Sequence, residues 1–340
     1  MSIHTTARSR RGLKFWIGRI LLGLLVLLIS LGIIGAIYQA IGIAQDARDF
    51  LPPDQLVDVG GYQLHIYCTG PENSGNPTVI LETLSGGLSP YWAWVQPEVA
   101  KVTRICSYDR AGRAWSDPSP QAQDLPQTAD ALHTLLAKAG IAPPYVLVGH
   151  SIGGLYVRQF AADHPAEVVG MVLVDAAHPE QFDWHPELWA ETESYMQMSS
   201  IFPFLARIGL FRFYFASGGE IDFQDLPSRQ RDEVAAAWST PKYFNSQRSE
   251  LMSAAEIYRQ AHELGPLGEL PLAVISAGTN LPTGWAALQA DLATLSVNQT
   301  HQTIEEASHA SLAFNPQHAY IVSTTILQVV DAARKGQPVR

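Results

Sequence analysis

The feature that most constrains the fold is a short stretch that joins a predicted strand to a predicted helix. It reads Val146-Leu147-Val148-Gly149-His150-Ser151-Ile152-Gly153-Gly154. This is an apolar strand followed by Gly-x-Ser-x-Gly. A serine in such a tight turn projects its hydroxyl, provided that the positions two before and two after it carry no side chain. The helix that follows points free N–H groups and its positive dipole end at an incoming oxyanion. The pattern predicts a nucleophilic Ser151.

Short apolar runs alternate with helical patterns from Val57 to the C-terminal region. The runs expected to be strands are Tyr62–Tyr67, Thr78–Leu81, Thr103–Tyr108, Val146–Val148, Val168–Val174 and Leu272–Ile275. The expected helices are Ala129–Ala139, Gly154–Asp163, Trp285–Leu295 and His318–Arg334. This order predicts an α/β fold with a mostly parallel sheet that is covered by helices on both faces.

One interval, residues 178–265, breaks this alternation because it contains no convincing strand. Residues Asp232–Trp238 and Glu250–Leu264 have helical patterns, and a structureless loop of this length is improbable. We therefore expect a helical insertion that packs over the edge of the sheet. Its many aromatic residues would line an apolar pocket, lie against a membrane surface or form a small core of their own.

The N-terminal region contains a membrane-spanning pattern. Ile20–Tyr38 is nineteen residues without a charge, and as a helix it spans roughly 28 Å, close to the hydrocarbon thickness of a bilayer. Residues 1–19 carry five basic residues and no acid, so the positive-inside rule places them in the cytoplasm and the body across the membrane. A cleaved signal peptide is the alternative, with Gly42-Ile43-Ala44 near a cleavage point, but its apolar core would be unusually long. Residues 39–54 are expected to be a linker.

The charge of the body limits its partners. The whole chain carries −10, so the residues after the basic segment carry −15, and an acidic body repels nucleic-acid phosphates. The sequence contains no His-Glu-x-x-His, no paired Cys-x-x-Cys and no Gly-x-x-x-x-Gly-Lys-Ser/Thr. We therefore expect neither a metal ion nor a nucleotide cofactor. The two cysteines, Cys68 and Cys106, are either inert buried thiols or a disulfide of an oxidising compartment.

These features together resemble the α/β-hydrolase superfamily over residues of about 55 to 335. Tyr145–Gly154 resembles its nucleophile elbow, and Ser107–Gly112 resembles its structural loop after the fourth strand. The resemblance implies an eight-stranded core from residues 55–177 and 266–340, with residues 178–265 as a helical cap after the sixth strand. It also implies that the second strand lies beside the fourth, which favours a bridge between Cys68 and Cys106.

The resemblance implies a histidine base on the loop after the last strand. His309 follows the strand-like run Thr303-Ile304 and precedes the C-terminal helix, so it is the expected general base. The acid that orients it is less clear from the residues. Asp175 ends the sixth predicted strand, whereas Asp291 follows the seventh and Asn280 stands where an aspartate would be convenient. We expect Asp175, with Asp291 as the alternative and Asn280 as a third possibility.

Two backbone N–H groups would form the oxyanion hole. The first is that of Ile152, the residue after the nucleophile, and the second lies on the loop Glu82–Gly87 after the third strand. Family members often carry His-Gly-x-Gly there, whereas this chain has Thr83-Leu84-Ser85-Gly86. We expect Ser85 rather than Leu84 to supply the second donor.

The sequence thus predicts a membrane-anchored serine hydrolase that cleaves carboxylic esters, with apolar substrates, through an acyl-enzyme intermediate. One alternative is an amidase or aminopeptidase, for which Glu187, Glu191 and Glu193 of the insertion are candidate ligands of a substrate amine. The other alternative is a binding protein that keeps the fold without the chemistry. Epoxide or haloalkane chemistry would need an aspartate at position 151.

Overall fold

The computed structural model describes residues 11–72, 75–219 and 223–339. Eight strands of these residues form one sheet in the order β1-β2-β4-β3-β5-β6-β7-β8. Their bounds are β1 Gln55–Asp58, β2 Gln63–Thr69, β3 Thr78–Glu82, β4 Ile105–Tyr108, β5 Tyr145–His150, β6 Val168–Val174, β7 Leu272–Ala277 and β8 Gln299–Ile304. The pairs β1–β2 and β2–β4 are antiparallel and the other pairs are parallel. The predicted mostly parallel sheet is confirmed.

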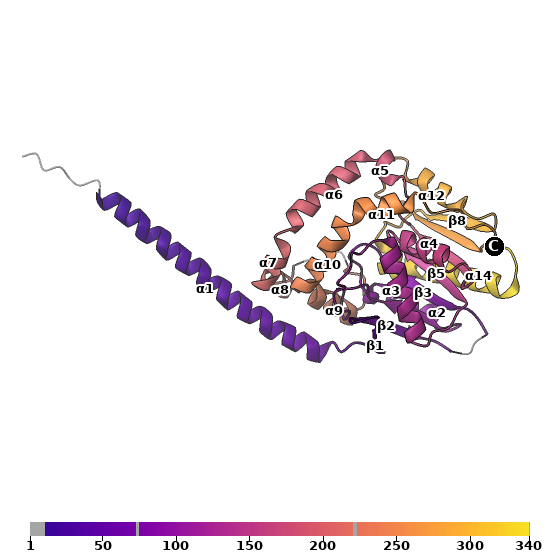
Figure 1. Ribbon diagram of the computed structural model, residues 1–340, viewed down its shortest axis with the longest axis horizontal. Helices are drawn as coiled ribbons and strands as arrows, with labels where there is room; N and C mark the ends of the chain where they lie inside the picture. Colours follow the sequence, from indigo (N-terminus) through magenta and orange to yellow (C-terminus); the bar gives the residue numbers. More distant parts are fainter. Residues whose placement is uncertain (1–10, 73–74, 220–222, 340) are drawn as a thin grey trace, which may run out of the picture.

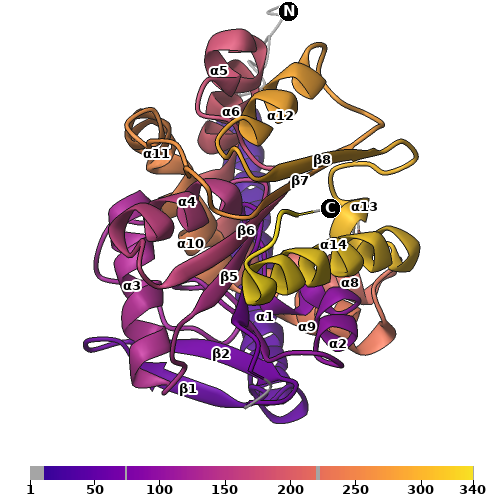
Figure 2. The ribbon, with the colours of Figure 1, turned by 90° about the vertical axis from the view of Figure 1, so that its right-hand side faces the viewer.

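Helices cover both faces of this sheet, as Figure 2 shows. On one face α3 (Leu125–Lys138), α4 (Gly153–Asp163) and α12 (Trp285–Ala293) pack against alternate strand residues such as Leu147. On the other face α2 (Val95–Val99) and α14 (Pro316–Lys335) pack against Val146 and Val148, with the short η1 (Ser89–Trp92) and α13 (Ser311–Phe314) nearby. Neighbouring strand residues point to opposite faces, so each central strand is apolar throughout.

The antiparallel pairing of β2 with β4 places Cys68 directly opposite Cys106. The two residues form a disulfide. This confirms the bridge that the family resemblance implied. It ties together the strands at one edge of the sheet, while the elements of the candidate site lie at the centre and toward the other edge.

The interval between β6 and β7 is helical in the described residues. It contains α5 (Gln181–Trp184), α6 (Pro186–Ser199), α7 (Phe202–Arg207), α8 (Leu210–Ala216), α9 (Ser228–Trp238), α10 (Pro241–Met252) and α11 (Ala254–Ala261). We call residues 178–265 the insertion. The helical pattern predicted over Glu250–Leu264 is confirmed for residues 250–252 and 254–261, which a turn at Ser253 divides between α10 and α11.

The aromatic residues of the insertion divide into three groups. Some form a core within it, where the rings of Phe211 and Phe244 lie 4.3 Å apart. Two, Phe182 and Tyr258, line the cavity described below. Others, including Phe204, are exposed. The expected pocket lining and the expected small core each apply to some of these residues, and contact of the exposed ones with a membrane surface stays a prediction.

The N-terminal helix α1 runs from Arg11 to Asp49 and projects from the body (Figure 1). Within the described residues it is the helix whose length and composition would allow it to cross a membrane. The prediction of a linker over residues 39–54 is wrong for residues 39–49, which are helical. No proline precedes Pro52-Pro53, and this segment packs on the insertion, where Gln39 Nε2 donates to the Ser239 carbonyl at 2.7 Å. The predicted basic segment 1–19 is described only from residue 11.

Candidate active site

The turn between β5 and α4 has the geometry that a projecting serine needs. Ser151 has a positive φ of 57°, a conformation that costs energy for a residue with a side chain. A Cβ atom at Gly149 would lie 2.6 Å from the Gly153 carbonyl oxygen, and one at Gly153 would lie 2.8 Å from the carbonyl oxygens of Glu82 and Thr83. The turn therefore needs glycine at both positions, and it presents Ser151 at the wall of a cavity.

The imidazole of His309 is held by a buried carboxylate. Nδ1 of His309 lies 2.6 Å from Oδ2 of Asp175, whose side chain is fully buried at the end of β6. The other carboxylate oxygen accepts from Trp285 Nε1 at 3.0 Å and from the Ala277 N–H at 3.1 Å. Burial would raise the pKa of Asp175, but the hydrogen bonds from His309, Trp285 and Ala277 lower it. The carboxylate is therefore ionised and fixed in orientation.

Asp291, the alternative acid, lies elsewhere. Its carboxylate is 3.0 Å from Nε2 of His178 and is largely exposed. Asn280 is exposed on the loop after β7. The structure therefore brings His309 together with Asp175 and with neither of these two residues.

A second histidine supports the loop that carries His309. His150, the neighbour of Ser151, is buried, and its ring centroid lies 4.8 Å from that of His309. Its Nε2 donates to the His309 carbonyl at 3.0 Å. Burial and the nearby His309 lower the pKa of His150 to about 3, so the ring is neutral. The turn that carries Ser151 thus also anchors the loop of His309.

The Ser151 hydroxyl makes no hydrogen bond with His309, and the two residues are connected through His150, the neighbour of Ser151, whose ring packs on His309. Among the described residues the hydroxyl makes no side-chain hydrogen bond, and the His309 side chain is 38% exposed. Catalytic hydrogen bonds of unliganded enzymes are often long and tighten when substrate binds. Because Nδ1 of His309 is taken by Asp175, Nε2 is the nitrogen that remains for Ser151 or a substrate.

A cavity of about 280 Å³ opens beside Ser151. Its lining includes both residues predicted for the oxyanion hole, Ser85 and Ile152. In the described part of the chain, neither backbone N–H donates to another protein group. The rest of the wall comes from the insertion and is mainly apolar, with Gln181, Phe182, Leu188, Glu191, Thr192, Glu250, Leu251, Ala254 and Tyr258.

The loop that carries Ser85 is fixed by buried charges. Arg110 donates to the Thr83 and Leu84 carbonyls at 2.8 and 2.7 Å and is ion-paired with Glu82. Arg110 also lies 2.9 Å from Glu250 of α10, which in turn accepts from the Ser85 hydroxyl. Burial would raise the pKa of Glu250, but the positive charges of Arg110 and Arg113 lower it to about 2.

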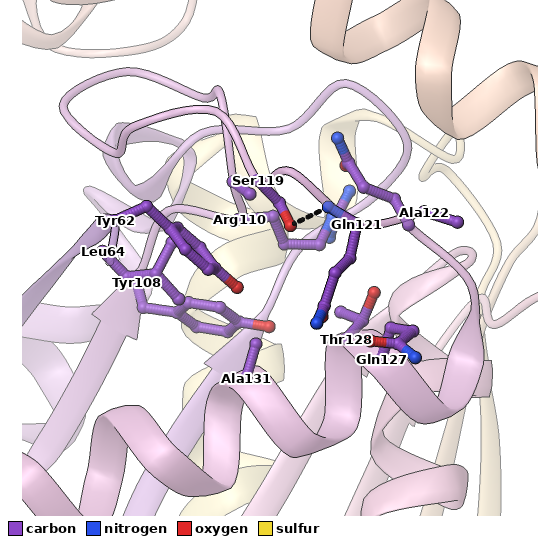
Figure 3. Close-up of a pocket in the computed structure, with 12 residues that line it drawn as sticks. Tyr62, Leu64, Tyr108, Arg110, Ser119, Gln121, Ala122, Gln127, Thr128 and Ala131 are labelled. Atoms are coloured by element: carbon purple, nitrogen blue, oxygen red, sulfur yellow. Dashed lines mark hydrogen bonds between the residues drawn. The ribbon is translucent and has the colours of Figure 1, made fainter. Parts of the chain in front are cut away.

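A second, smaller cavity is lined in part by Arg110 (Figure 3). Its volume of about 20 Å³ is enough for roughly one water molecule. Tyr62, Tyr108 and Gln121 contribute to its wall, and none of the predicted catalytic residues does. Of these two cavities, the one beside Ser151 is the larger and is the one that contains predicted site residues.

One group of metal-ligating residue types lies away from this site. His133, His164 and Glu167 are half-buried, with their ligand atoms within 4.8 Å of one another. The two imidazole rings stack 3.8 Å apart and nearly parallel. An ion in the plane of one ring would lie outside the plane of the other, so the arrangement does not suit a shared metal ion.

Sequence reasoning missed the charged residues behind the site. Arg110 was expected to be structural, and Glu82 and Glu250 had no expected role. Glu82 is a carboxylate at the end of an apolar strand, as is Asp175, and this shared position is the signal that could have marked it. No local pattern marks Glu250, because it reaches the site only through the packing of the insertion.

Comparisons with known proteins agree with this architecture. A family model for the α/β-hydrolase fold matches residues 76–198. The chain is 27% identical over 294 residues to an uncharacterized protein of Schizosaccharomyces pombe, which covers 76% of this chain and 52% of that protein. The chain therefore spans about half the length of this relative.

Two solved structures show the same fold. Epoxide hydrolase CorEH superposes with a TM-score of 0.64 at 17% identity, covering 81% of this chain and 97% of that chain. The enol-lactonase from Burkholderia xenovorans LB400 superposes with a TM-score of 0.58 at 21% identity, covering 82% of this chain and 100% of that chain. The fold and the motif together define an α/β hydrolase. The chain belongs to the α/β-hydrolase superfamily.

Proposed function

We propose that this protein is a membrane-anchored serine hydrolase that cleaves carboxylic esters through an acyl-enzyme intermediate. The observation that carries the proposal is the hydrogen bond between Asp175 and His309, on a loop that His150, the neighbour of the projecting Ser151, contacts. A nucleophile, a base and a group that orients the base are the parts that such a mechanism needs.

The proposed reaction has two steps. Nε2 of His309 takes the Ser151 proton as the hydroxyl oxygen attacks the ester carbonyl, and Asp175 stabilises the imidazolium. The oxyanion accepts from the N–H groups of Ile152 and Ser85. His309 then gives its proton to the leaving alcohol, which leaves the acyl group on Ser151. Water, deprotonated by His309, hydrolyses this ester and restores the hydroxyl.

The cavity supports apolar substrates. Phe182, Leu188, Leu251 and Tyr258 of the insertion face the space beside Ser151. We propose that the insertion acts as the cap of this site and that the acyl or aryl part of the ester packs against these side chains. The lactone of the enol-lactonase is a cyclic ester, the same class of bond.

The proposed location at a membrane rests on α1. Its uncharged stretch Ile20–Tyr38 has the length of a single membrane span, and the basic residues before it favour a cytoplasmic N-terminus. The hydrolase domain, residues 55–340, would then lie on the extracytoplasmic side. A disulfide between Cys68 and Cys106 is compatible with such an oxidising compartment.

The test of the proposed chemistry is the Ser151→Ala variant with a series of aryl esters. We expect kcat to fall by several orders of magnitude, on the order of 10⁶ in the best-studied triads. Ser119→Ala is the matched control, since Ser119 lines the small cavity, which none of the predicted catalytic residues lines. Equal turnover by Ser151→Ala and Ser119→Ala would refute the proposal.

A peptide-bond hydrolase is the second candidate. Glu191 of α6 lines the cavity and could accept a hydrogen bond from a substrate amine. Glu250 is less suited to this role because Arg110 and Arg113 already neutralise it. Comparing aryl esters with aminoacyl anilides, each on the wild type and on Glu191→Gln, separates the two functions. An amide preference that is lost in Glu191→Gln would favour the peptidase.

A further inference from the structure

The insertion exposes a group of large apolar side chains at the turn between α7 and α8. Residues 201–216, here called the α7–α8 corner, carry Arg207 and Arg212 as their charged residues. Phe204 is 58% exposed and Phe213 is 63% exposed. Ile201 and Leu210, each three positions earlier in the chain, are also about half exposed. An exposed apolar group of this kind marks a surface that another apolar phase covers.

The α7–α8 corner contacts α1 inside the apolar stretch of that helix. A Cβ atom at Gly35 would collide with the carbonyl oxygen of Ile208. Gly209, whose φ is +72°, also lies close to α1. A Cβ atom there would lie 2.9 Å from the Gly35 carbonyl oxygen and 3.1 Å from the Tyr38 ring. The two backbones therefore meet at a point that only small residues permit.

Polar contacts fix this arrangement further along α1. Arg212 of α8 donates from Nε to Gln39 Oε1 at 2.9 Å and from Nη2 to Asp46 Oδ2 at 2.6 Å. Its side chain fills the space over Gly42, where a Cβ atom would collide with it. The contact thus extends from Gly35 to Asp46, about three turns of helix, and it sets the height of the α7–α8 corner along α1.

On the proposed anchorage, that height lies near the end of the predicted membrane span. Gly35 lies three residues before Tyr38, the end of the predicted span Ile20–Tyr38, so it is about 4.5 Å inside that end. Apolar residues of interfacial helices are buried to a similar depth, about 5–10 Å. In Figure 1 the α7–α8 corner is the part of the body that lies alongside α1 where the helix leaves the body.

We propose that the α7–α8 corner is a second membrane contact, with Phe204 and Phe213 inserted among the lipids of the leaflet that α1 enters. The proposal rests on the proposed anchorage of α1. The partner is the lipid bilayer and not a protein, because the corner is bound to the spanning helix itself at the height of its apolar end. The body would then contact the membrane at two points, which would fix its orientation relative to the bilayer.

This contact also gives the insertion a defined orientation. Helix α6 carries Leu188, Glu191 and Thr192 of the cavity wall in its first half, and it ends at Ser199, next to the α7–α8 corner. Its fourteen residues span about 21 Å. The helix that forms part of the cavity wall therefore ends at the membrane contact.

The test uses fluorescent labels on the full chain in vesicles. The two native cysteines are joined in a disulfide, so a single added cysteine can be labelled with a polarity-sensitive probe such as NBD. The labelled variants are Phe204→Cys and Phe213→Cys at the α7–α8 corner, Tyr320→Cys on α14 as an equally exposed control, and Leu28→Cys in the middle of the apolar run. Vesicles of phosphatidylcholine and phosphatidylglycerol contain a lipid with a spin label near its headgroup or in its acyl chain.

We expect spin-labelled lipid to remove most of the fluorescence at positions 204 and 213 and to leave position 320 unchanged. Aqueous iodide should do the reverse. Quenching at 204 and 213 that is no stronger than at 320, with position 28 still quenched by the acyl-chain label, would overturn the second contact while leaving the anchor intact. If the acyl-chain label does not quench position 28 either, then α1 does not span the membrane. This result would contradict both the anchorage and the second contact. Near-UV circular dichroism of each variant checks that it is folded.

Discussion

Nδ1 of His309 lies 2.6 Å from the carboxylate of Asp175, although the two residues are 134 positions apart in the chain. The distance is set by the order of the sheet, since Asp175 directly follows β6, β7 lies next to β6, and β8 leads into the loop of His309. The carboxyl ends of these parallel strands lie at one edge of the sheet, next to the turn of Ser151. The proposed mechanism follows from this arrangement.

Asp175→Asn should lower kcat by about 10⁴-fold, because an amide at this position stabilises the wrong tautomer of His309 and does not stabilise its cation. Asp291→Asn is the matched control, since Asp291 also contacts a histidine, His178, but outside the proposed site. Steady-state kinetics with a soluble aryl ester measures both. A larger loss in Asp291→Asn than in Asp175→Asn would reverse the assignment of the acid.

Glu250→Gln should destabilise the protein by about 3–5 kcal/mol, because the neutral amide leaves Arg110 and Arg113 buried with less compensating charge. The pKa of Glu250 is about 2 in the folded chain, below its ordinary value of 4.5. Its contribution to stability is therefore complete above pH 4.5 and is lost as the pH falls toward 2. Urea unfolding in detergent at a series of pH values measures this. A stability equal to that of the wild type at pH 7 would contradict the role of the buried pair.

His150 should make the folded state sensitive to acid in a higher pH range. Its pKa falls from 6.5 to about 3 on folding, so between these values the unfolded chain binds a proton that the folded chain does not. Stability is therefore lost as the pH drops from 6.5 toward 3, by at most about 1.4 kcal/mol per pH unit. His150→Gln, which can keep a donor toward the His309 carbonyl, should lose less stability over this range. Identical pH profiles for the two proteins would show that His150 is not buried as a neutral ring.

Removing the disulfide should cost about 3–4 kcal/mol, because the bridge closes a loop of 38 residues in the unfolded chain. Cys68→Ala combined with Cys106→Ala removes it without leaving a free thiol. Thermal unfolding with and without a thiol reductant gives the measurement. The reductant should lower the melting temperature of the wild type and leave that of the double variant unchanged, and a wild type that does not respond would contradict the bridge.

The sheet and the turn of Ser151 could be predicted because their signals are local. A run of apolar β-branched residues followed by Gly149, Ser151 and Gly153 is a strand and a tight turn wherever it occurs. The end of α1 was missed because its uncharged run stops before the helix does. Residues 39–49 remain helical through packing on the insertion, and a search for apolar residues does not detect such contacts.

The charged network behind Ser85 could not be predicted for a similar reason. Glu250 comes from a helix 165 positions away from Ser85, and its neighbours in sequence give it the pattern of an ordinary surface helix. Only the folding of the insertion over the sheet brings it to Arg110. The sequence shows that the α7–α8 corner is rich in aromatic residues. Their position beside α1 could not be predicted, because it results from the packing of the insertion on that helix.

The most direct test of the central claim is covalent labelling of Ser151 by a fluorophosphonate. We expect the wild-type protein to be labelled, mass spectrometry to place the adduct on Ser151, and Asp175→Asn and His309→Ala to react far more slowly. Ser119→Ala should be labelled like the wild type. A folded wild-type protein that stays unlabelled at Ser151, or labelling that does not depend on His309, would contradict the proposed hydrolase and favour a binding protein of the same fold.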